Sequence, residues 1–237
     1  MKPLLQLVLL RHGQTLWNKQ HRSTGWADVG LTEAGERQAR EAGRALAAAG
    51  FQFDTFYSSQ LHRAKATMEI VKSEMRCDAS SILERWRLNE RHIGAFEGLG
   101  PFAVVSKYGL RRFIQCQLCY DVSPPPLALD DARFPGNQER FAGIEAENWP
   151  RAESMKQTWL RVRPFWEGEI VPALRSRRRL LIVSHKNTLR LLLEAITGRP
   201  ASFFDMLSVR ACKPLVFELD DDLRPLRGYV VKRSPNG

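Results

Sequence analysis

The chain of 237 residues is long enough for a full α/β core, and we expect one domain, 1–237. A hydrophobic share of 43% and a charged share of 26% are ordinary globular values, and no apolar run is long enough to span a bilayer. These values exclude a disordered chain and a membrane protein. Lys and Arg outnumber Asp and Glu by 36 to 26, which favours anionic partners.

The distribution of basic residues and of cysteines indicates the kind of partner and the cellular compartment. The one dense basic run, Arg175 to Arg179, has no interleaved aromatic residues, so we expect a solvated loop rather than a nucleic-acid surface. A field that attracts small phosphorylated anions explains the charge equally well. Cys116 and Cys119 have CxxC spacing but no second ligand pair nearby, which predicts reduced thiols on a helix face. With no signal-peptide cleavage site, we predict a cytoplasmic protein.

An apolar run from Leu4 to Leu10 predicts a strand that is buried on both faces. It ends in Arg11, His12 and Gly13, so a cation and an imidazole follow the strand directly. In open α/β sheets, ligands bind at the carboxyl ends of the strands. The polar stretch after it, 14–30, can return further side chains to the same place: Asn18, Arg22, Thr24 and Gly25.

A second strand and helix repeat this pattern. Thr32 is expected to cap a helix over 33–50, and 53–57 forms the next strand. Ser58-Ser59 is then expected to cap a helix that carries Arg63 in its first turn. A helix N-terminus beside an arginine is a phosphate-binding geometry.

The middle of the chain is less regular. Residues 80–92 form a short extended piece, and the turn-rich segment 94–150 is predicted to be an insertion that covers the active site. Helical periodicity returns over 153–174, with a kink expected at Pro164.

The opening arrangement recurs near the C-terminus. A buried strand over 180–183 ends in Ser184-His185-Lys186-Asn187 before a helix over 188–197, and a further strand spans 213–219. The rest of the chain is charged and expected to be peripheral. Strands that alternate with helices predict an α/β fold, a three-layer sandwich whose mainly parallel central sheet is covered by helices on both faces.

Neighbouring strands would bring His12 and His185 to one pocket together with Arg11 and Arg63. This set lacks the carboxylates of a hydrolytic metal site, and its guanidinium groups repel cations. Arginine forks match phosphate oxygens, and a neutral imidazole is a competent nucleophile toward phosphorus. Glu90 is the best candidate for the proton donor to the leaving oxygen.

From Val8 to about Val231 the sequence resembles the cofactor-dependent phosphoglycerate mutases of the histidine phosphatase superfamily. The matching stretches are Leu10-Arg11-His12-Gly13 with Trp17-Asn18, Ser23-Thr24-Gly25-Trp26 with Asp28-Val29, Leu88-Asn89-Glu90-Arg91-His92, Lys107-Tyr108-Gly109, Pro124-Pro125, and Ser184-His185 with Asn187.

The resemblance implies a catalytic set in which His12 is phosphorylated, three side chains hold the phosphoryl group, and one carboxyl acts as acid and base. These residues are His12; Arg11, Arg63 and His185; and Glu90. We expect substrate binding by Asn18, Thr24, Gly25, Arg91, Lys186 and Asn187, and no metal. A hydroxyl acceptor would make the enzyme a mutase primed by 2,3-bisphosphoglycerate, with no tightly bound cofactor, whereas water would make it a phosphatase.

The sequence departs from the mutase pattern where the rest of the substrate would be held. The family has tyrosine at Ile93, lysine at Pro101, an arginine pair at Gln117 and Leu118, and glycine at Lys186. The family's extended C-terminal tail is also expected to be missing, which would expose a phosphohistidine to water.

The leading interpretation is therefore a phosphoglycerate mutase-like isomerase with an altered substrate pocket. The alternatives are a phosphatase that hydrolyses a phosphomonoester and a catalytically lapsed protein that only binds phosphorylated ligands. The expected partner is a small phosphorylated anion, without nucleic acid or membrane, and a homodimer is compatible with the sequence.

Overall fold

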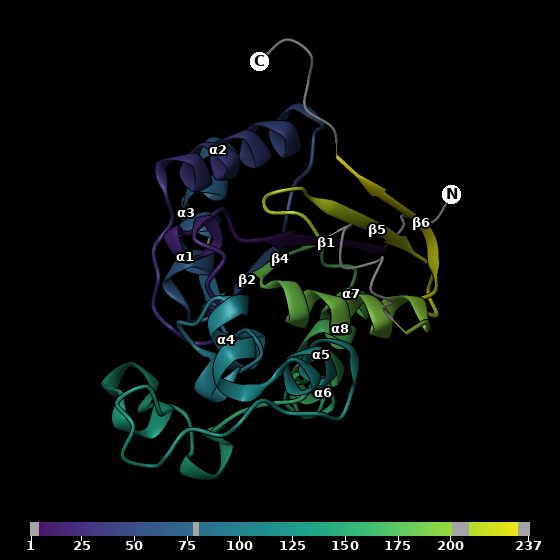
Figure 1. Ribbon diagram of the computed structural model, residues 1–237. Coiled ribbons are helices and arrows are strands. Elements are labelled where there is room, and N and C mark those ends of the chain that lie inside the picture. Colours follow the sequence, from purple (N-terminus) through teal and green to yellow (C-terminus); the bar gives the residue numbers. More distant parts are fainter. Residues whose placement is uncertain (1–4, 78–80, 201–208, 232–237) are drawn as a thin grey trace.

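The computed structural model describes residues 5–77, 81–200 and 209–231. Its centre is a six-stranded sheet with the strand order β3-β2-β4-β1-β5-β6 (Figure 1). The strands are β1 Leu5–Arg11, β2 Thr55–Ser58, β3 Ile82–Glu84, β4 Leu180–Ser184, β5 Leu215–Leu219 and β6 Pro225–Val230. The α/β class and the central sheet predicted from the sequence are confirmed.

Four neighbouring strands run parallel and end at the same edge of the sheet. In the register, Arg11 of β1 pairs with Ser184 of β4, and Ser58 of β2 pairs with Val183 of β4. The residues that follow these three strands therefore emerge side by side. This edge is where the sequence predicts the functional site.

The other two strands, β5 and β6, are antiparallel to their neighbours. After Leu219 the sequence predicts only a charged, peripheral segment, and Pro225–Val230 of that segment forms the edge strand β6. Nearly every residue of β6 is exposed, so no buried face marks the strand in the sequence.

Helices cover both faces of the sheet, as predicted. Val8 and Leu10 of β1 belong to the apolar core under α2 and α3, whereas Leu7 and Leu9 belong to the core on the other face, under α6, α7 and α8. Figure 1 shows these two groups of helices on opposite sides of the sheet. The α-helices are α1 Leu16–Lys19, α2 Glu33–Ala48, α3 His62–Glu74, α4 Pro101–Tyr108, α5 Leu110–Leu118, α6 Met155–Phe165, α7 Val171–Arg175 and α8 Lys186–Thr197.

The helix caps agree with the sequence at one site and differ at another. Thr32 caps α2 as predicted, since its hydroxyl accepts a hydrogen bond from a first-turn N–H at 3.1 Å. The Ser58-Ser59 cap predicted for α3 is wrong, because the helix begins at His62 and its N-cap is Leu61, which makes no side-chain cap hydrogen bond. Arg63 still lies in the first turn of the helix.

The segment 94–150 is more regular than its composition predicts. It contains α4, α5 and short 3₁₀ turns at Pro135–Asn137, Glu139–Phe141 and Ala146–Asn148. The part from residue 127 onward lies at the bottom of Figure 1, away from the sheet. Cys116 is buried within α5, Cys119 is the C-cap residue of that helix, and both thiols are free.

The helix predicted over 153–174 is present but interrupted. Pro164 lies within α6, and a π-helical turn, Trp166–Ile170, joins α6 to α7. The loop that follows carries exposed arginines, as predicted. Within the described ranges, no helix is long and apolar enough to cross a membrane.

Candidate active site

His12 directly follows β1, and its side chain is only 4% exposed. The ring Nδ1 lies 2.7 Å from the carbonyl oxygen of Gly13, which can only accept, so Nδ1 carries the proton and Nε2 keeps its lone pair. The N–H of Gly13 donates to Thr67 Oγ1 at 3.1 Å, and a Cβ on Gly13 would collide with the carbonyl of Gly35. This close packing fixes the ring with Nε2 as the nitrogen that can attack.

The two predicted histidines face each other across the sheet edge. Their ring centroids are 5.0 Å apart, and Nε2 of His185 lies 2.7 Å from Ser59 Oγ. Burial, together with the charges of Arg63 and Arg11, holds the pKa of His12 well below its usual range, and burial and Arg63 do the same to the pKa of His185. Both imidazoles are therefore neutral near pH 7.

Arg63 is held by the loop between α1 and α2. Its Nη2 donates to Gly25 O at 2.8 Å and its Nη1 to Ala27 O at 2.9 Å, and the side chain is 1% exposed. Burial lowers the pKa of Arg63 to about 10, so it stays charged at neutral pH. Arg11 has a weaker contact, from Nη1 to the Val209 carbonyl at 3.4 Å.

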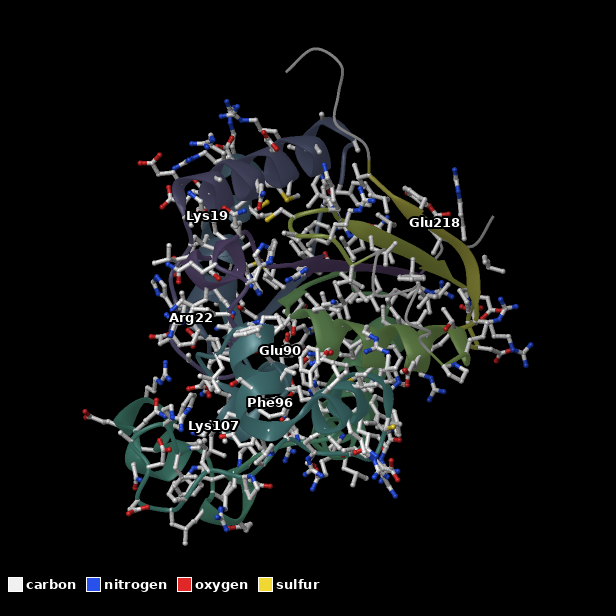
Figure 2. The ribbon with its side chains drawn as sticks, in the orientation of Figure 1. Lys19, Arg22, Glu90, Phe96, Lys107 and Glu218 are labelled. Carbon is white, nitrogen blue, oxygen red and sulfur yellow. The ribbon has the colours of Figure 1, made fainter. Side chains whose placement is uncertain are left out.

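A cavity of about 260 Å³ opens at this edge. Its lining is Arg11, His12, Asn18, Arg22, Ser23, Thr24, Gly25, Arg63, Glu90, Arg91, Ile93, Gln117, Lys186 and Asn187. Five of these side chains are basic and one, Glu90, is acidic; Glu90 and the basic Arg22 are labelled in Figure 2. Every predicted site residue lines the cavity except His185, which packs against His12.

Several buried polar atoms at this site make no hydrogen bond to any described residue. They are Arg11 Nε, Thr24 Oγ1, Arg63 Nε, Arg91 Nε and His185 Nδ1. An unpaired buried polar group costs about 1–3 kcal/mol, so a cluster of them indicates a ligand. Guanidinium and hydroxyl donors around a permanently cationic pocket match a tetrahedral oxyanion such as a phosphoryl group.

The carboxyl group of Glu90 is anchored by backbone donors. Its Oε1 accepts from the N–H of Arg91 at 2.8 Å and from the N–H of Asn187, in the first turn of α8, at 3.2 Å. Across the cavity, Oδ1 of Asn18 accepts from the N–H of Thr15 at 3.2 Å, which leaves the Asn18 amide group free to donate to a ligand.

Comparison with known proteins agrees with this geometry. The model of the histidine phosphatase superfamily (branch 1) matches residues 7–126 and 127–231. The chain belongs to the histidine phosphatase superfamily. A relative, 2,3-bisphosphoglycerate-dependent phosphoglycerate mutase 1 of Nitrosomonas europaea, is 44% identical over 227 residues, which are 96% of this chain and 97% of the relative. The chain is thus a phosphoglycerate mutase-like enzyme of that superfamily.

Several solved structures share the fold of this chain at lower sequence identity. Alpha-ribazole phosphatase from Shigella flexneri matches with a TM-score of 0.70 and 22% identity over 97% of each chain. Phosphoglycerate mutase from Bacillus anthracis matches with a TM-score of 0.67 and 20% identity over 98% of this chain and 93% of the other. Mycobacterial glucosyl-3-phosphoglycerate phosphatase matches with a TM-score of 0.69 and 22% identity over 97% of this chain and 99% of the other.

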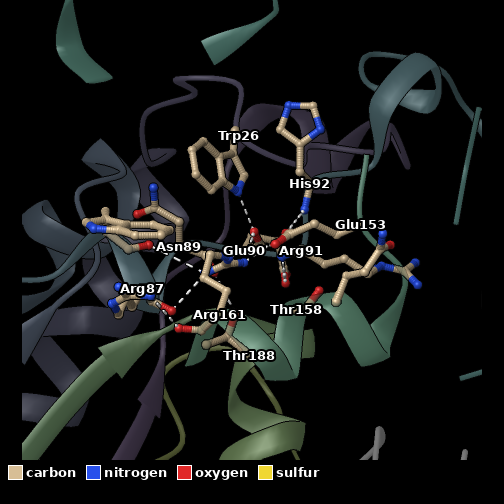
Figure 3. Close-up of polar contacts among 12 residues, drawn as sticks. Trp26, Arg87, Asn89, Glu90, Arg91, His92, Glu153, Thr158, Arg161 and Thr188 are labelled. Carbon is tan, nitrogen blue, oxygen red and sulfur yellow. Dashed lines mark hydrogen bonds and ion pairs between the residues drawn. The ribbon is translucent and has the colours of Figure 1, made fainter. Parts of the chain in front are cut away.

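In this superfamily member a buried ion pair fastens the segment that carries Glu90 (Figure 3). Arg161 of α6 donates from Nε to Glu153 Oε1 at 2.7 Å and from Nη2 to Oε2 at 2.9 Å. The same guanidinium donates to the carbonyls of Arg87 at 2.8 Å and Glu90 at 3.1 Å, and Glu153 accepts from the His92 N–H at 2.8 Å. Both partners of the pair are almost fully buried, so they fix the backbone on either side of Glu90.

Sequence reasoning missed the ion pair and some of the lining. An arginine in a helix is ordinarily solvated, and no sequence signal distinguishes Arg161 from the exposed Arg163 two positions later. For Ser59, which lies against His185, the sequence predicts only a helix cap. Of the other lining residues, Arg22 is among the side chains expected at this place, and Ile93 and Gln117 are at positions where the family holds its substrate. Ser23 is the lining residue for which the sequence predicts no place in the pocket.

Replacing Arg161 with methionine should lower the free energy of unfolding by about 3–5 kcal/mol, because Glu153 would be left buried without its partner. As a matched control, Arg163→Met removes an exposed pair with Glu167 and should cost less than about 1 kcal/mol. Urea denaturation of both variants measures the difference. Equal losses would contradict the role assigned to the buried pair.

Proposed function

We propose that the protein transfers phosphoryl groups through a phosphohistidine at His12. The observation that carries this proposal is the set of unpaired buried donors around a neutral imidazole whose Nε2 is free. Nε2 attacks phosphorus while Arg11, Arg63 and His185 donate to the phosphoryl oxygens and stabilise the charge that develops on them. A neutral nucleophile suits this step, since an imidazolium has no lone pair to attack with.

Glu90 supplies the acid and base chemistry in this proposal. It protonates the leaving alkoxide in the first half of the cycle, and it removes a proton from the acceptor in the second half. Its Oε1 is tied to two backbone N–H groups, so the other carboxyl oxygen is the one that meets the substrate. General acid–base catalysis of this kind contributes about 10²- to 10⁴-fold to the rate.

The acceptor decides between the two activities of the superfamily. A substrate hydroxyl as acceptor gives a mutase, as the name of the Nitrosomonas relative describes, and water gives a phosphatase. The anion-binding donors at Arg11 and Arg63 also fit a 2,3-bisphosphoglycerate primer, which would supply the phosphoryl group that loads His12.

We infer that the outer part of the pocket disfavours mutase turnover. Ile93 and Gln117 line the cavity there and carry no charge, although Lys186 adds a cation. Each charge-assisted hydrogen bond that the substrate cannot form is worth about 1.5–3 kcal/mol. The protein would therefore act as a phosphatase, or on a phosphorylated metabolite other than phosphoglycerate.

Two further proposals concern the setting of the reaction. Segment 94–150 would cover the cavity, because Gln117 of α5 lies in its lining. The four free cysteines favour a reducing compartment, which supports a cytoplasmic location.

His12→Ala should abolish acid-labile labelling of the protein by a phosphorylated donor, because the imidazole Nε2 that takes the phosphoryl group would be gone. The exposed His62 provides a matched control, and His62→Ala should retain full labelling. Labelling is measured with a radioactive donor, followed by acid treatment of the denatured protein. Persistent labelling of the His12 variant would remove His12 from its role.

With 3-phosphoglycerate as substrate, release of inorganic phosphate should exceed formation of 2-phosphoglycerate, and 2,3-bisphosphoglycerate should stimulate isomerisation weakly. The physical reason is the loss of cations in the outer pocket. Both products can be followed in one coupled assay, with Glu90→Gln as the inactive control. Vigorous isomerisation that depends on 2,3-bisphosphoglycerate would defeat the inference about the pocket and leave phosphohistidine transfer intact.

A further inference from the structure

Glu97 is a buried carboxyl group that the proposed reaction does not use. It follows the 3₁₀ turn Gly94–Phe96, and its side chain is 6% exposed. It does not line the cavity, but it contacts the loop that does. A Cβ on Gly25, whose φ is +53°, would lie 3.1 Å from Glu97 Oε2 and 2.7 Å from the side chain of Ile93, so glycine is required there.

A single peptide group joins Glu97 to Arg63. The N–H of Trp26 donates to Glu97 Oε2 at 3.2 Å, and the carbonyl of the same peptide group, Gly25 O, accepts from Arg63 Nη2 at 2.8 Å. Hydrogen bonds in a chain polarise one another, so a negative charge at one end strengthens the bond at the other. The charge of Glu97 therefore acts on the guanidinium that faces the phosphoryl site.

The groups around Glu97 determine the pH at which it ionises. Arg133 donates to the backbone carbonyl of Glu97 at 3.1 Å, and Arg22 donates to the backbone carbonyl of Gly98 at 2.6 Å. Arg140 is paired with Asp28 of the adjoining loop at 3.3 Å. The charges of Arg133 and Arg140 favour the carboxylate, but burial outweighs them and raises the pKa of Glu97 to about 7. The group therefore changes charge across the neutral pH range.

We propose that Glu97 is a positioning residue for the phosphoryl site, which holds Arg63 in its binding geometry through the peptide group between Gly25 and Trp26. This inference rests on the proposed function, because it takes Arg63 to bind the phosphoryl oxygens. The ionised carboxylate is the better acceptor for Trp26, so it holds the loop and Arg63 more firmly than the acid does. Affinity for an oxyanion should then weaken as Glu97 becomes protonated.

The test is the affinity for orthovanadate, a tetrahedral oxyanion, of the wild type and of Glu97→Gln from about pH 6 to about pH 8.5. The ratio of the two Kd values cancels the ionisation of the ligand and of groups that both proteins share. At about pH 8.5 we expect Glu97→Gln to bind vanadate about fivefold more weakly than the wild type, which is the contribution of about one hydrogen bond. At about pH 6 the two proteins should bind equally, and the ratio of the Kd values should change with a midpoint near pH 7.

The exposed Glu139 offers a matched control, and Glu139→Gln should give a ratio of one at every pH. A flat ratio for Glu97→Gln, or tighter binding by that variant, would overturn the proposal, since tighter binding would mean that Glu97 only repels the anion. If the variant does not fold, the pH titration of the Trp26 amide resonance in the wild type decides, because it should shift near pH 7. Wild-type protein that binds no vanadate would instead contradict the proposed function itself.

Discussion

Basic side chains and unpaired hydrogen-bond donors surround His12, and an anion is the partner that can both accept from these donors and balance their charge. The five basic side chains of the lining face a single carboxylate, and the buried Nε atoms of Arg11 and Arg63 reach no partner in the described parts of the chain. Burying these groups without a partner costs stability, which a bound anion would restore. Burial, together with the same positive charge, depresses the pKa of His12, so the groups that favour an anion in the cavity also keep this imidazole neutral.

The strand order brings the basic side chains and the two imidazoles to one edge of the sheet, and two buried groups, the Arg161–Glu153 pair and Glu97, hold the loops around them. Parallel strands β1 and β4 deliver the two imidazoles to one edge, and the helix after β2 delivers Arg63. The other groups arrive on loops, which need fastening. Arg161, paired with Glu153, fixes the backbone around Glu90. Glu97 fixes the loop whose Gly25 carbonyl accepts a hydrogen bond from Arg63. Neither Arg161, Glu153 nor Glu97 lines the cavity itself.

The sequence predicted the parts of the site that local patterns encode. Apolar runs that end in His12 and His185 mark buried strands with an imidazole directly after each strand, and the resemblance placed Glu90 beside them. No local sequence pattern predicts the Arg161–Glu153 pair or the contact of Glu97 with the Trp26 N–H. Tertiary packing alone determines the partners of Arg161 and Glu97. The edge strand β6 was missed for a related reason, since its exposed residues show no buried face.

A crystal structure of the protein grown with orthovanadate decides whether His12 is the residue that takes the phosphoryl group. We expect vanadium bonded to Nε2 of His12, with its oxygens accepting hydrogen bonds from the Nε atoms of Arg11 and Arg63 and from Nδ1 of His185. Vanadate bound elsewhere in the cavity, or held with the His12 ring turned so that Nε2 points away, would contradict it.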